Sequence, residues 1–150
     1  MSETVIVPPA RGMRRRRGSF IPPLLIVTFL IYNAMAFLMF GGKPDGWAGE
    51  VFHLTMVSGV LWQLSWGDLL LVLGLACLFV EVIKSTNTGR SSIVEHMLST
   101  AVFVIYLVEF LLVGAAASSV FFLLMMMSLV DVVAGFSISI TGAGRDVTME

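Results

Sequence analysis

Hydrophobic and polar residues alternate along this chain in whole segments rather than residue by residue. Four apolar runs are long enough to cross a hydrocarbon core, which takes about 20 helical residues. They cover residues 20–40, 66–83, 94–113 and 120–140. The sequence GAAASS, residues 114–119, separates the last two runs, and its small residues favour a tight turn between two helices over one bent helix. The predicted fold class is therefore all-α, an integral membrane four-helix bundle.

A less regular segment lies between the first two runs. GGKPDG, residues 41–46, ends the first helix, because glycine and proline interrupt regular structure. Residues 47–64 are apolar but contain scattered polar side chains. We interpret them as an additional amphipathic helix, either interfacial or re-entrant, and the pattern does not choose between the two. Trp47, Trp62 and Trp66 are expected at the level of the lipid headgroups.

The two ends of the chain are polar. Residues 1–18 and 142–150 are predicted to be tails, which leaves 19–141 as one membrane domain. With both termini in the cytoplasm, every basic residue except Lys43 falls on the cytoplasmic side. Basic residues favour that side of a membrane. We therefore expect cytoplasmic termini, and the bacterial cytoplasmic (inner) membrane as the location.

The basic N-terminal tail leaves one alternative open. Arg14, Arg15, Arg16 and Arg17, followed by an apolar run and the sequence AMA at 34–36, have the form of a secretory signal, whose cleavage would leave three spans. The apolar run continues past residue 36 and exceeds a usual signal core, which favours a retained span. The four arginines are expected to contact anionic lipid headgroups. They lack the interleaved aromatic residues of a nucleic-acid-binding surface, so no nucleic acid is expected.

Two helix starts have a local sequence signal. Ser65 precedes Asp68 by three residues, and Ser92 precedes Glu95 by three residues. Both pairs match the capping box, in which two side chains bond to free amides at a helix N-terminus. We predict a helix start at each pair.

Composition narrows the chemistry. Hydrophobic residues make up 57% of the 150 residues and charged residues 13%, and the mean hydropathy is +0.95. Cys77 is the single cysteine, which excludes an intramolecular disulfide or dithiol chemistry. The two histidines lie on opposite sides of the predicted membrane, and Glu50 with His53 supplies too few ligands for a closed metal site. We expect no catalytic residues, no metal and no cofactor.

Polar residues inside the apolar runs are the candidate site. Helical spacing places Glu81 on one face with Gly67 and Gly74, Asp131 with Ser128, and Glu109 with Tyr106. Counting residues from the end of each run places Asn33, Tyr106 and Glu109 in one layer and Asp131 and Glu81 in another, with His96 near Glu81. Glu109 and Asp131 lie about 10 Å apart in depth by this count, so they are not a paired dyad.

An ionised carboxylate in mid-membrane costs about 2.5–3.5 kcal/mol. No lysine or arginine lies at the depth of Asp131 or Glu109, so we expect both acids to be protonated much of the time unless water reaches them. Such acids either hydrogen-bond across helices, here to Thr28, Tyr106, Asn33 or Ser128, or form a proton or cation pathway.

The sequence lacks repeat symmetry and a broken helix, features that support transport. We therefore expect a non-enzymatic accessory or scaffold subunit of a membrane complex, in contact with lipid and with a membrane partner or a second copy. The alternative is a small proton- or cation-coupled transporter or channel that uses Asp131, Glu109 and Glu81.

Overall fold

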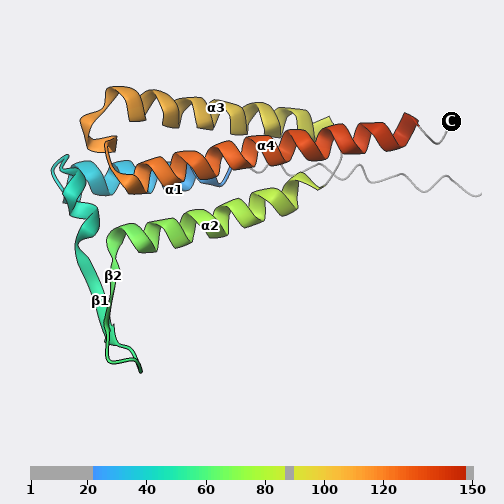
Figure 1. Cartoon of the computed structure of the whole chain (residues 1–150). Helices are drawn as coiled ribbons and strands as arrows, with labels where there is room; N and C mark the ends of the chain where they lie inside the picture. Colours follow the sequence, from blue (N-terminus) through green and yellow to red (C-terminus); the bar gives the residue numbers. More distant parts are fainter. Residues whose placement is uncertain (1–21, 87–89, 148–150) are drawn as a thin grey trace, which may run out of the picture.

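The computed structural model describes residues 22–86 and 90–147. Most of this chain is helical (Figure 1). Four α-helices run side by side: α1 (Leu25–Ala34), α2 (Trp66–Ser85), α3 (Arg90–Leu112) and α4 (Ser119–Val147). Helix α4 lies between α2 and α3 and packs extensively on both, whereas α1 has smaller contacts with all three. The expected Arg14–Arg17 lipid contact lies outside the described residues.

Three helices are long and apolar enough to cross a membrane, namely α2, the 94–112 part of α3 and the 119–138 part of α4. The first predicted span is shorter. Helix α1 continues through a π-helical turn, Met35–Met39, and together they extend about 22 Å at 1.5 Å per residue. That length falls short of a hydrocarbon core of about 30 Å. The structure thus supports three of the four predicted spans by length and composition.

The segment between α1 and α2 corrects the all-α prediction. Residues 47–64 were predicted to form an amphipathic helix, but the chain forms a 3-10 turn (Pro44–Ala48) and an antiparallel hairpin of β1 (Glu50–Thr55) and β2 (Leu61–Ser65). Gly59 has a φ of +81°, and its amide donates to the Met56 carbonyl at 2.8 Å. Side chains alternate in character from Phe52 to Thr55, which is the period of a strand. In Figure 1 the hairpin projects crosswise from one end of the helices, called here the hairpin end.

The start of α2 agrees with the predicted capping box. The Asp68 amide donates to the Ser65 hydroxyl at 3.1 Å, and the Ser65 amide donates to the Asp68 carboxylate at 2.9 Å. The second predicted helix start is displaced, because α3 already begins at Arg90. The side chain of Ser92 lies outside the described part of the chain. Helix α4 has a cap that the sequence did not reveal, since the Phe121 amide donates to the Ser118 hydroxyl at 3.1 Å.

The turn between α3 and α4 forms as predicted, with a short 3-10 helix at Gly114–Ala116. The two helices pack against each other along their length as a helical hairpin (Figure 1). Helix α4 continues to Val147, past the predicted boundary at residue 140. Backbone hydrogen bonds of an α-helix need no apolar side chains, so the change to polar composition does not by itself end the helix.

Aromatic side chains form the core near the hairpin end. Tyr32 stacks on Trp47 with ring centroids 4.5 Å apart and meets Phe121 at 4.7 Å. Tyr106 lies 5.2 Å from Phe121 and 4.9 Å from Phe29. This cluster joins α1, α3, α4 and the 3-10 turn, and so fixes the base of the hairpin to the bundle.

Glycines allow the helices to approach closely. A Cβ atom on Gly67 would lie 2.6 Å from a Val120 methyl carbon, and one on Gly74 would lie 2.7 Å from a Leu124 methyl carbon. Both distances are below van der Waals contact. The predicted small-residue face of α2 is therefore the face that packs on α4.

Candidate functional site

Glu81 on α2 is the most buried acid of the candidate set, with 2% of its surface exposed. Its carboxylate accepts the backbone N–H of Leu24, just before α1. The Lys84 ammonium lies 2.7 Å from the other carboxylate oxygen. Glu81 therefore joins the first two helices through a backbone hydrogen bond and has a counter-charge one turn away.

Asp131 on α4 is also buried, with 5% exposed. The Ser99 hydroxyl of α3 hydrogen-bonds to its carboxylate, and Glu81, Lys84 and His96 are close enough to interact with it electrostatically. The prediction that no lysine or arginine lies near Asp131 is thus wrong, because Lys84 interacts with it. Counting residues gives the depth of the backbone, whereas the long side chain of Lys84 extends back along its helix.

His96 completes this group, which we call the carboxylate cluster: Glu81, Lys84, His96, Ser99 and Asp131. The imidazole is buried and packs on Gly135, where a Cβ atom would lie 2.4 Å from its Nδ1. Three helices, α2, α3 and α4, contribute to the cluster. Glu81 and Asp131, which were predicted to share one layer, interact electrostatically in this cluster.

Glu109 lies apart from the carboxylate cluster, as predicted. Asn33 on α1 donates from its side-chain amide to the Glu109 carboxylate at 3.2 Å and also donates to the Phe29 carbonyl. Both side chains are only half-buried. We use the name α1–α3 edge for the surface formed by this pair and by the α3 residues beside Glu109, which include Val108 and Leu112.

An apolar stripe of α3 borders Glu109. The stripe and Glu109 line a shallow depression of about 350 Å³. Its lining residues are Val104, Ile105, Val108, Glu109, Leu112 and Val113. Leu112 has 78% of its surface exposed, and Val108 has 48%. The α1–α3 edge thus combines a carboxyl group with an uncovered apolar surface.

Tyr106 was predicted to lie in the Glu109 layer, but its hydroxyl has other hydrogen-bond partners. It lies 3.0 Å from the Thr28 hydroxyl and donates to the Leu25 carbonyl at 3.1 Å. Ser128, a predicted partner of the acids, is 1% exposed, and its hydroxyl has no hydrogen-bond partner within the described part of the chain. Neither residue bonds to an acid as the sequence suggested.

Sequence reasoning missed two residues that organise the polar groups. Lys84 is the counter-charge of Glu81, and its i, i+3 spacing on one helix was the available signal. Tyr32 donates to the Ala115 carbonyl at 2.8 Å and lies 2.7 Å from the Ser118 hydroxyl, which ties α1 to the α3–α4 turn. A hydroxyl within an apolar helix needs such a partner.

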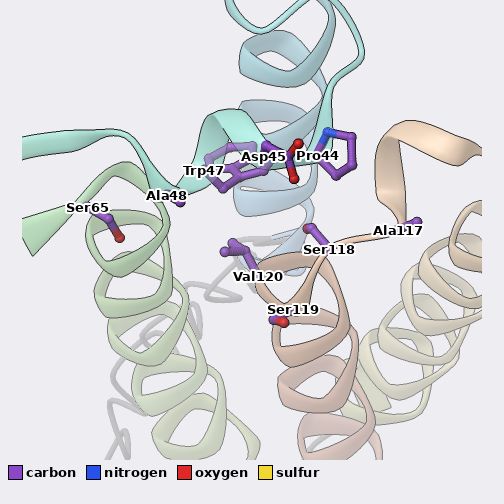
Figure 2. A pocket seen from close by; sticks show the side chains of 9 residues that line it. All are labelled: Pro44, Asp45, Trp47, Ala48, Ser65, Ala117, Ser118, Ser119 and Val120. Carbon is purple, nitrogen blue, oxygen red and sulfur yellow. The ribbon is translucent and has the colours of Figure 1, made fainter.

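A pocket of about 370 Å³ lies at the hairpin end. Figure 2 shows Trp47 and Asp45 of the 3-10 turn facing Ser118 and Val120 at the start of α4, with Ser65 to one side. Ser65 and Ser118 already cap α2 and α4. These hydroxyl groups therefore serve the fold.

His53 and Glu50 contact each other on the hairpin, and the Gln63 amide donates to Glu50 at 3.1 Å. Among the described residues, no three histidine, cysteine or acidic side chains are grouped to hold a metal ion. Comparison of the chain with protein-family models, with curated proteins and with solved structures found no match.

Proposed function

We propose that this protein is a non-enzymatic accessory or scaffold subunit of a membrane complex. In this proposal the helices lie in the bacterial inner membrane as a four-helix bundle, with both termini in the cytoplasm and the hairpin end on the outer side. Three helices of sufficient length and hydropathy support the membrane location. The basic residues support the orientation.

The observation that carries the scaffold role is the α1–α3 edge. Glu109 is a half-buried carboxyl group within an apolar helix, and its described hydrogen-bond partner is the neutral amide of Asn33. A polar group facing lipid is costly, so such groups usually face protein. The apolar stripe beside Glu109 offers a surface on which another helix can pack.

The occupant we propose for this edge is a membrane helix of a partner subunit that presents a hydrogen-bond donor to Glu109. Interhelical hydrogen bonds of this kind stabilise helix pairs in membranes by about 0.6–2 kcal/mol. Packing of the partner against Val108 and Leu112 would add to that stability. The carboxyl group then selects the partner, and the apolar stripe contributes the contact area.

Affinity purification in mild detergent, followed by mass spectrometry, tests this role. Wild-type protein is expected to retain a stoichiometric partner, Glu109→Gln to retain it through the remaining amide, and Glu109→Leu to lose it. Val72→Leu on the exposed face of α2 is the matched control, with the partner retained. A wild-type protein that is purified from its native membrane as a partner-free monomer contradicts the proposal.

A second candidate, proton- or cation-coupled transport, is favoured by the carboxylate cluster. Two buried acids, a lysine and a histidine meet between three helices, and ionisable residues inside membranes frequently mark ion pathways. Protein reconstituted in vesicles would then show flux driven by a pH gradient. Loss of flux on Asp131→Asn, with the fold intact, supports transport, whereas an absence of flux in wild-type protein contradicts it.

A further inference from the structure

The hairpin has two chemically different faces. Opposite residues on the strands share a face, and successive residues alternate between faces. The pairs Phe52↔Leu64 and Leu54↔Trp62 lie on one face, which we call the apolar face. The alternate pairs, His53↔Gln63 and Thr55↔Leu61, lie on the other.

The second face is mainly polar. Glu50 contacts His53 and accepts a hydrogen bond from Gln63, so these three side chains form one exposed network. Leu61 is the apolar exception, at the far end of the strand from this network. The hairpin is therefore amphipathic, with one apolar face and one mainly polar face.

The apolar face is uncovered. Phe52, Leu54 and Trp62 are 52%, 50% and 47% exposed. A two-stranded hairpin that extends into water is marginally stable at best, and it gains stability when one face packs on a surface. Three large apolar side chains on one face therefore indicate that the hairpin lies against something apolar.

The apolar face meets the helices at the base of the hairpin. Leu64, on the apolar face, is half-buried where the hairpin joins the bundle, whereas its neighbour Gln63 is exposed. Strand β2 ends at Ser65, which caps α2. The apolar face thus begins where the hairpin joins α2, whose first two turns expose Leu69 and Val72.

The hairpin also has the right position for a membrane surface. It projects crosswise to the helices from the end where α2 and α4 begin (Figure 1). If the helices cross a bilayer, a crosswise element at their ends lies along the headgroup layer. Tryptophan and amphipathic elements are typical of that layer, and its water satisfies the unpaired backbone groups of the strand edges.

We propose that the hairpin is a lipid-binding element whose apolar face lies in the headgroup layer of the outer leaflet, with Phe52, Leu54 and Trp62 in contact with lipid. This inference rests on the membrane placement of the proposed function. It adds a lipid contact that is independent of the partner at the α1–α3 edge. The hairpin then holds the bundle at a fixed depth and rotation relative to the outer surface.

Spin labels on single cysteines test the proposal in the Cys77→Ala protein, reconstituted in vesicles of phosphatidylcholine and phosphatidylglycerol. Leu54→Cys reports the apolar face, Thr55→Cys the polar face and Val72→Cys the α2 surface. Collisions with oxygen report lipid, and collisions with a water-soluble nickel chelate report water. We expect labels 54 and 72 to collide more often with oxygen than with the nickel chelate. The ratio of nickel to oxygen collisions is expected to be at least several-fold higher for label 55 than for label 54.

Label 72 separates the two hypotheses. If label 72 favours nickel, the membrane placement itself is overturned. If label 72 favours oxygen but labels 54 and 55 are equally open to nickel, only the hairpin proposal is overturned. Protection of label 54 from both reagents also overturns it, because that result indicates a protein contact.

A second measurement avoids labels. Quenching of tryptophan fluorescence by brominated lipid is expected to fall on Trp62→Phe, because Trp62 lies in the headgroup layer. Unchanged quenching contradicts the proposal.

Discussion

Replacing Lys84 with methionine tests whether the carboxylate cluster depends on its internal ion pair. The lysine ammonium lies 2.7 Å from the Glu81 carboxylate, and the two side chains are 16% and 3% exposed. At that distance the attraction is about 6 kcal/mol for an effective dielectric constant of about 20. The cost of taking both charges out of water offsets much of this attraction.

Breaking a buried ion pair on one side typically costs about 3–5 kcal/mol, because it leaves an uncompensated charge. The cost is smaller here, since the isolated carboxyl group can take up a proton. We therefore expect Lys84→Met to lower the free energy of unfolding by about 2–3 kcal/mol. The double variant Glu81→Gln with Lys84→Met keeps an acceptor for the Leu24 amide and is expected to recover at least about 1 kcal/mol.

Unfolding in mild detergent by titration with sodium dodecyl sulfate, followed by circular dichroism, measures these differences. Lys43→Met is the matched control, because Lys43 is exposed in the loop after α1, and it is expected to change stability by less than about 0.5 kcal/mol. A Lys84→Met protein as stable as the control would refute the reasoning. The reasoning would also be refuted if the double variant lost as much stability as the single variants Glu81→Gln and Lys84→Met lose together.

The same unfolding assay checks two further predictions. Gly135→Ala is expected to destabilise the bundle by about 1–3 kcal/mol, because the new methyl group clashes with the His96 ring. Adding His96→Ala in the same chain is expected to relieve part of that loss. Gly114→Ala, whose methyl group meets nothing within 4 Å, is the control, and equal losses at the two glycines would contradict the packing. Tyr32→Phe is expected to cost about 1–2 kcal/mol, because the Ala115 carbonyl loses its hydroxyl donor, and an unchanged stability would show that this bond adds nothing.

The helices were predictable because long apolar runs and a capping box are local signals. The run at 66–83 and the Ser65–Asp68 pair predicted the start and end of α2 within a few residues. The small residues 114–119 predicted the turn between α3 and α4. These features depend on residues close in sequence, so a single chain is enough to reveal them.

The hairpin was missed for a physical reason. Apolar composition in 47–64 is compatible with a helix or a strand, and only the alternation from Phe52 to Thr55, with Gly59 in the turn, distinguishes them. The site was predictable in part. Counting residues from the end of each run placed Asn33 near Glu109 and Glu81 near Asp131. The partners of Tyr106 and the role of Lys84 depend on how far and in which direction a side chain extends, which residue counting does not give.

The scaffold role is tested most directly by photo-crosslinking in living cells. A benzophenone amino acid at Val108 lies on the α1–α3 edge, and the same amino acid at Val72 lies on the exposed face of α2. We predict a discrete protein adduct from position 108 and none from position 72. A lack of protein adducts at position 108, or equal adducts at both positions, would contradict the proposal that this edge binds a partner subunit.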